Sequence, residues 1–161
     1  MRIHSTLGAA VLMLFLATGL AAQASANASA SVSLQVFSNL TLTKNTDLDM
    51  GITNPGINQV VAATAGSAGK FTMGGQGSVG VTVTYPASIT LTSGANTLSF
   101  APDVNGLDTD TQGSSSSVSS GSSVTTSAGG AYYFWLGGTA TVPGAQATGT
   151  YIGSLTLSVA Y

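Results

Sequence analysis

Residues 149–161 read GTYIGSLTLSVAY, and this stretch decides the fold that we expect. One parity carries large apolar side chains, whereas the other carries mostly serine, threonine and alanine. The apolar positions are Tyr151, Leu155, Leu157, Val159 and Tyr161. Successive side chains of a β-strand point to opposite faces. The alternation therefore predicts a strand over residues 150–161 with one core face and one solvent face.

The segments before this strand have the same character. Short runs rich in valine, threonine and aromatic residues alternate with turns of glycine, serine, asparagine and proline. Such runs are typical of strands, and their spacing is that of a two-sheet sandwich. We predict an all-β antiparallel β-sandwich. Its further strands are expected at residues 32–36, 40–42, 60–61, 71–73, 79–85, 89–91, 98–100, 132–136 and 139–142.

Two glycine-rich segments interrupt this pattern. Residues 113–127 are nearly all serine and glycine, with Val118 and Val124 as their only large apolar side chains. Such a segment has little surface to bury, so we expect a long exposed loop or a weak edge hairpin. The pair Gly137-Gly138 follows the densest apolar run and predicts a bulge or bend at which one strand changes partner or sheet.

The first residues have the pattern of an export signal. Arg2 supplies a positive charge, residues 7–20 form an apolar run, and Ala22-Gln23-Ala24 is a small-residue cleavage pattern. We predict a cleaved signal peptide at residues 1–24, an N-terminal extension at 25–37 and the sandwich domain at 38–161. No later apolar run is long enough to span a membrane, so the protein is expected to pass through a bacterial periplasm to the cell surface or the medium.

Composition excludes several classes of function. Beyond residue 24 the chain has no histidine, arginine, cysteine or glutamate, and its charges are five aspartates and two lysines. No disulfide can form, and no basic patch can meet nucleic acid. A general base poised near neutral pH is usually histidine or a perturbed carboxylate. We therefore expect a protein that is not an enzyme; a paired-aspartate mechanism among Asp103, Asp108 and Asp110 is a distant alternative.

One acidic segment is a candidate cation site. Oxygen-bearing side chains surround a glycine at residues 103–110, and calcium prefers such ligands. The candidate ligands are Asp103, Asn105, Asp108 and Asp110. The spacing is not that of an EF-hand, because no bidentate glutamate follows. A solvated acidic turn is the simpler interpretation, and no cofactor is expected elsewhere.

The aromatic run at residues 132–135 allows two interpretations. Exposed aromatic rings could form a platform for sugars. Alternation, however, places Tyr133 and Trp135 on one face of a strand and Tyr132 and Phe134 on the other. At least one of these pairs must be buried, and we expect Trp135 to be a core residue.

A second alternation lies at the other end of the chain. Within residues 28–36, small or apolar side chains alternate with serine and glutamine. The apolar positions are Ala28, Ala30, Val32, Leu34 and Val36. Lysine ordinarily protects strand edges from pairing, and it is nearly absent here. We therefore predict that this extension is a donor strand for a sheet edge beside residues 150–161 of a neighbouring subunit.

Four motifs occur in order along the chain: LDMG at residues 48–51, FTMGG at 71–75, GGTATV at 137–142 and GTYIG at 149–153. In this arrangement the chain resembles a bacterial secreted family known as domain of unknown function 4402. Met50 is a departure, because the family usually has an aromatic residue at that point. The resemblance implies export and a β-sandwich, and it assigns no catalytic residues.

The strand at residues 149–161 also resembles the last strand of pilins from chaperone and usher systems, which begins near glycine, alternates apolar residues and ends at or next to tyrosine. That resemblance implies an immunoglobulin-like (pilin-like) antiparallel β-sandwich that lacks one strand, a neighbour that supplies it, and a periplasmic chaperone as a partner. We expect an exported structural subunit of a surface fibre or coat. The alternative is a monomeric secreted or cell-surface sandwich that binds a glycan or another protein.

Overall fold

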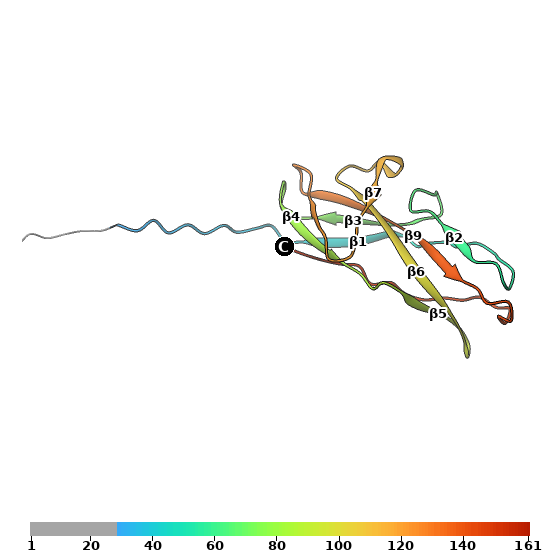
Figure 1. The fold of residues 1–161 in the computed structure, drawn as a ribbon. Coiled ribbons are helices and arrows are strands. Elements are labelled where there is room, and N and C mark those ends of the chain that lie inside the picture. Colours follow the sequence, from blue (N-terminus) through green and yellow to red (C-terminus); the bar gives the residue numbers. More distant parts are fainter. Residues whose placement is uncertain (1–28) are drawn as a thin grey trace, which may run out of the picture. The chain divides into compact units, whose positions relative to one another are not determined.

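The structure is a computed structural model that describes residues 29–161. Apart from one short 3-10 turn, every regular element in this range is a strand (Figure 1). No helix among the described residues could cross a membrane. The elements are β1 (Thr41–Thr46), β2 (Gln59–Val61), β3 (Gly69–Gly74), β4 (Gly80–Thr84), β5 (Ile89–Ser93), β6 (Asn96–Leu107), η1 (Gln112–Ser114), β7 (Ser116–Ser117), β8 (Ser123–Thr125), β9 (Ala131–Thr141) and β10 (Ser158–Ala160).

The strands form two antiparallel sheets within one compact unit, Gln35–Tyr161. The larger sheet has the order β1-β3-β9-β6-β5, with β2 paired to β9 and β7 paired to β6. The smaller sheet has the order β10-β4-β8. Every ladder is antiparallel, which confirms the predicted all-β fold of antiparallel sheets.

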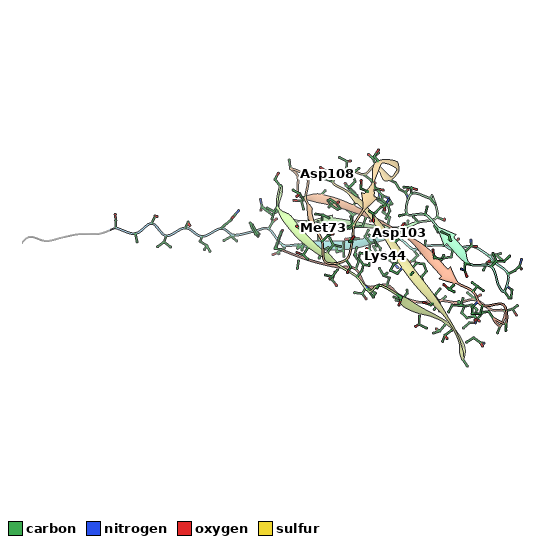
Figure 2. All side chains as sticks on the ribbon, viewed as in Figure 1. Lys44, Met73, Asp103 and Asp108 are labelled. Carbon is green, nitrogen blue, oxygen red and sulfur yellow. The ribbon has the colours of Figure 1, made fainter. Side chains whose placement is uncertain are left out.

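The core lies between the two sheets, as in a β-sandwich. Met73 on β3 and Phe134 on β9 come from the larger sheet, and Val81 and Val83 come from β4 in the smaller one; all four are fully buried. Figure 2 shows Met73 within the body of the molecule. Burying such side chains stabilises the fold by about 1.5–3 kcal/mol each. The alternation in β4 places its threonines outside.

Strand β9 is the centre of the larger sheet and changes partner halfway along. It pairs with β3 as far as Leu136 and with β2 from Gly138 onward. At Gly137 the neighbouring backbone comes so close that a Cβ atom would lie 2.4 Å from the Val61 carbonyl oxygen. Only glycine fits this approach. The predicted change of partner at the glycine pair is confirmed.

The serine-rich segment is more ordered than its composition predicts. It contains η1, β7 and β8, and β8 pairs with β4. Val118 and Val124 are both buried in the main core, and the Val118 amide donates to the Val104 carbonyl at 2.8 Å. Of the two predicted alternatives, the long exposed loop is wrong, because the rest of the domain provides the apolar surface on which these two valines pack. The weak edge hairpin is nearer, since β8 is a short edge strand, but β7 and β8 pair with different strands and not with each other.

The segment at residues 150–161 keeps its alternation but forms less ladder than predicted. Only Ser158–Ala160 pair with β4, and Ile152 forms one bridge with Thr92 of β5. Leu157 is nevertheless buried, and its neighbours Thr156 and Ser158 are exposed. The prediction of one continuous strand is wrong because its neighbour is interrupted around Pro86, between β4 and β5.

Candidate functional site

The main feature of the surface is a seam between the two sheets. One side is the edge strand β1 with the chain around it, residues 38–53, and the other is the C-terminal segment, residues 146–161. β1 is at the edge of the larger sheet and β10 is at the edge of the smaller one. Within residues 29–161, no strand pairs with the outer edge of either. The seam therefore offers two sets of free backbone groups.

One half of the seam, residues 38–42 against 157–161, is closed by a contact that we call the clasp. The Tyr161 hydroxyl donates to the Ser38 carbonyl oxygen at 2.9 Å and accepts from the Gln76 amide at 2.7 Å. The Tyr161 and Phe37 rings lie 4.9 Å apart. Gly75 makes room for the clasp, because a Cβ atom there would lie 2.7 Å from the Tyr161 hydroxyl.

Apolar side chains fill the closed half behind the clasp. They come from both sides of the seam and pack against the main core: Leu40, Leu42, Leu157 and Val159. Leu42 pairs with Met73 across the ladder, so this half of the seam lies directly over the fully buried centre of the sandwich.

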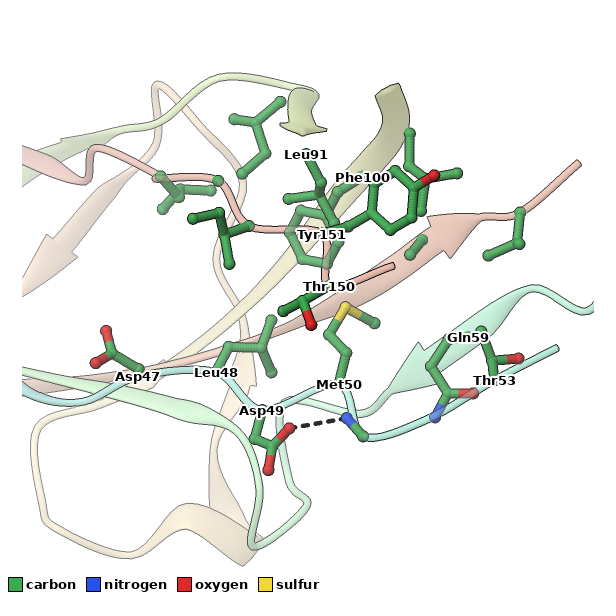
Figure 3. A pocket seen from close by; sticks show the side chains of 18 of the residues that line it. Asp47, Leu48, Asp49, Met50, Thr53, Gln59, Leu91, Phe100, Thr150 and Tyr151 are labelled. Carbon is green, nitrogen blue, oxygen red and sulfur yellow. Dashed lines mark hydrogen bonds between the residues drawn. The ribbon is translucent and has the colours of Figure 1, made fainter. Parts of the chain in front are cut away.

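The other half of the seam, residues 44–53 against 146–155, is open. It contains a cavity of about 850 Å³, within the range of about 300–1,000 Å³ that is usual for binding sites. Met50 enters from the segment after β1, and Tyr151 enters from the C-terminal segment (Figure 3). The apolar lining includes Leu48, Phe71, Leu91, Phe100, Leu136 and Leu155.

A tight turn after β1 shapes one wall of this cavity. The Asp49 carboxylate accepts from the Gly51 amide at 2.8 Å, and Gly51 has φ +70°. The Asp49 amide donates to the Ser67 carbonyl at 3.0 Å. Leu48 and Met50 are half-buried and line the cavity on either side of Asp49, whose exposed carboxylate lies at its rim. This arrangement gives the LDMG motif a structural role, because only glycine adopts such a φ without strain.

The opposite wall is held by glycines and by Tyr151. The Tyr151 hydroxyl donates to the Ala147 carbonyl at 2.7 Å. A Cβ atom at Gly153 would lie 2.7 Å from the Leu91 side chain, so the C-terminal segment packs closely on β5. At the rim, Ile52 and Ile152 are 97% and 68% exposed. The cavity thus offers a mainly apolar surface with an exposed apolar rim.

The predicted assembly residues of the C-terminal segment lie along this seam and are divided between its two halves. Tyr151 and Leu155 line the open half, whereas Leu157, Val159 and Tyr161 belong to the closed half. The sequence analysis missed Met50 and the other lining residues that come from distant strands. The LDMG motif was the one available signal, because its methionine replaces an aromatic residue at the cavity wall.

The predicted donor segment is described from residue 29 onward. Residues 29–39 form no strand, contrary to the strand predicted at residues 32–36, and the side chains of Val32, Leu34 and Val36 are 95%, 86% and 77% exposed. Ala30 is exposed as well. Ala28 and the predicted signal peptide lie outside the described residues.

The acidic segment is not the turn that its sequence predicts. Asp103 and Asn105 lie on β6, which continues to Leu107 because these residues pair with β9. Asp108 follows the strand (Figure 2), and Asp110 forms an ion pair with Lys70 at 2.6 Å. Within residues 29–161, no three acidic, histidine or cysteine side chains are grouped as they would be around a metal ion.

The aromatic run is divided between the two faces of β9. Tyr132 and Phe134 lie in the core, with ring centroids 5.0 Å apart. Trp135 is 2% exposed, which confirms its predicted burial, and it stacks on Tyr133 at 6.3 Å. Lys70 lies 5.4 Å from the Tyr133 ring centroid, a favourable cation–π geometry. The four rings therefore do not form one flat surface.

A family model described as Domain of unknown function (DUF4402) matches residues 40–161, which include both sides of the seam from Leu40 onward. No curated protein matches the chain.

Proposed function

The chain belongs to the Domain of unknown function (DUF4402) family, and from this premise we propose that it is an exported structural subunit that assembles by β-strand addition. In this proposal the domain is an immunoglobulin-like, pilin-like sandwich that lacks one strand. The subunit has no catalytic activity of its own. It reaches the cell surface through the periplasm, where a chaperone can cover the seam, and there it builds a fibre or coat.

The observation that carries the proposal is the open half of the seam. A strand placed there could extend the outer edge of β1 at residues 44–46, which pairs with no strand of the described chain, and put alternate side chains into the cavity. The cavity is lined mainly by apolar side chains, and its charged lining residues, Lys44, Asp47 and Asp49, come from one wall. Lys44 and Asp47 already form an ion pair at 2.6 Å. An uncharged apolar strand is the partner that this surface fits.

The N-terminal extension has the properties of such a strand. Residues 25–36 contain no charged side chain, and Val32, Leu34 and Val36 alternate with serine and glutamine. Full burial of a valine or leucine side chain contributes about 1.5–3 kcal/mol. Three such side chains, with the backbone hydrogen bonds of an added strand, are a sufficient source of affinity for assembly.

The experiment that tests the proposal places charges on the apolar face of the extension. Val32→Asp with Leu34→Asp would bury unpaired carboxylates in an apolar cavity, so assembly should fail. The matched control is Ser31→Asp with Ser33→Asp, which adds the same charges to the face that should meet solvent. Particle size under native conditions is the measurement. Equal assembly of both variants would contradict the proposal.

A second experiment removes the extension and restores it as a peptide. Deletion of residues 25–36 should give folded monomers that cannot polymerise but that bind a synthetic peptide of the same sequence. The alternative is a monomeric sandwich whose cavity binds a glycan or a foreign protein. It would be supported if the parent protein remained a single monomeric species and the deletion variant did not bind the peptide.

A further inference from the structure

We infer that the clasp decides which molecule supplies the added strand and where that strand sits: residues 32–36 of a second copy occupy the open half of the seam, and none occupy the closed half. This inference rests on the proposed function. It adds the source and the position of the strand and the direction of the assembly.

The closed half has no room for an added strand. Its interior is already filled by leucine and valine side chains from both sides, which pack on the core. The clasp joins the two sides through hydrogen bonds from Tyr161 to Ser38 and from Gln76 to Tyr161. A strand inserted here would have to displace these side chains and break both bonds. The cavity begins only beyond Lys44 on one side and Leu155 on the other.

Chain length excludes the copy's own extension as the occupant. The clasp holds Ser38, and the cavity begins at Lys44, six residues or about 20 Å along the extended edge. A chain advances at most about 3.3–3.6 Å per residue. Val36 can therefore lie no more than about 7 Å from Ser38, and Leu34 no more than about 14 Å. Neither can enter the cavity of its own domain, and Val32, at most about 22 Å from Ser38, reaches only its near end, so the three side chains together can enter only the cavity of another molecule.

The size of the open half agrees with the apolar part of the extension. From Tyr151 to Leu155 the C-terminal segment covers about 13 Å, and the side chains of Val32, Leu34 and Val36 cover the same length in an extended strand. Three alternate side chains thus match the cavity, and the outward residues Ser31 and Ser33 would lie beside the exposed serines of the C-terminal segment.

The positions of donor and acceptor also give the assembly a direction. The extension leaves each domain at the clasp, which is one end of the seam, and the cavity occupies the other half. Donor and acceptor surfaces are therefore different, which makes the contact between copies heterologous. Heterologous contacts that do not close into a ring continue indefinitely. The expected product is a head-to-tail filament.

Disulfide trapping tests the inference, because the chain has no cysteine of its own. One copy carries Ser33→Cys, or Ser31→Cys as a second donor position. The other copy carries Ser154→Cys in the open half or, as a matched control, Ser158→Cys in the closed half; both serines are exposed. Neighbouring strands bring same-face Cβ atoms to about 4.5–5.5 Å, close to disulfide geometry. We expect at least tenfold more covalent dimer with Ser154→Cys than with Ser158→Cys.

The outcomes separate this inference from the proposed function. Equal or greater trapping at Ser158→Cys would overturn the position of the strand while leaving strand addition intact. A chain that carries both Ser33→Cys and Ser154→Cys should form intermolecular ladders; a crosslinked monomer would overturn the second copy as the source. Native monomers without crosslinks in any combination would overturn both the inference and the proposed function.

Discussion

The two halves of the seam are built from the same two chain edges, yet one is closed and the other is open. The closed half has large apolar side chains on both edges and Tyr161 across them. In the open half, Gly149 and Gly153 interrupt the apolar face of one edge, and the turn at Asp49–Gly51 bends the other. The comparison teaches that the edge of a sandwich is left open by missing side chains and a bent backbone as much as by a missing strand.

The largest expected difference between the halves is in the stability lost when a methionine in each is replaced by alanine. Met73 is fully buried beside the closed half, so Met73→Ala should lower the free energy of unfolding by about 2–5 kcal/mol. Met50 borders the cavity and is only half-buried, so Met50→Ala should cost less than about 1 kcal/mol, because a side chain that faces a cavity has fewer packing contacts to lose. Urea unfolding of both variants measures the difference. Similar losses at the two positions would contradict the division of the seam.

A smaller effect is expected from crowding the clasp. In Gly75→Ala the added methyl group would lie 2.7 Å from the Tyr161 hydroxyl and 2.8 Å from Leu40, a strain that should cost about 1–3 kcal/mol. Gly66→Ala is the control, because nothing lies within 4 Å of that position. Thermal melting of the two variants would show the loss, and an unchanged Gly75→Ala melting temperature would mean that the clasp is loose.

A still smaller effect is expected from two tyrosine hydroxyls. Tyr161→Phe removes the hydrogen bonds that join both sides of the seam, at about 1 kcal/mol for a typical bond. Tyr151→Phe removes bonds to residues only four or five positions away. Hydrogen exchange should therefore become faster along β1 in the first variant and stay unchanged there in the second. Equal protection of β1 in both variants would contradict a role for the clasp in holding this edge.

The smallest effect is expected at alkaline pH. Burial raises the pKa of Tyr132, and Asp108 raises it further; the pKa of Tyr85 is raised by burial and then by Asp103, against a lowering hydrogen bond from Ser120. Above about pH 10 the unfolded chain releases these protons while the folded state retains them, so stability falls as pH rises. Tyr132→Phe should weaken this fall relative to the parent. If the free energy of unfolding fell equally in the parent and in Tyr132→Phe from pH 8 to 11, this expectation would be contradicted.

The sequence predicted the parts of the fold that depend on local alternation. The faces of residues 150–161, the division of the aromatic run and the partner change at Gly137 all follow from side-chain period or from glycine sterics. The sequence-based prediction failed where contacts with residues distant in the chain determine the local structure. Val118 and Val124 order the serine-rich segment because the core receives them, and β6 extends through Asp103 because β9 lies beside it.

The candidate site was only half predictable for the same reason. Alternation identified one edge of the seam, but the cavity is formed by Met50, Phe100 and other side chains from separate strands. The division into two halves depends on a contact between Tyr161 and the Gly75 region, far apart along the chain. No local pattern carries information on such a contact.

The clasp also has a consequence for the order of folding. Tyr161 and Ser38 are separated by 123 positions in the chain, so their hydrogen bond closes a loop around nearly the whole domain. Contacts between distant residues carry the largest loop-closure entropy, and folds rich in them reach the native state in milliseconds to seconds. We therefore expect β1 to dock late and the seam to remain accessible along its full length while the rest of the sandwich is already formed. The newly made subunit is then most vulnerable to wrong pairing at the surface that it uses, once folded, to recognise its neighbour.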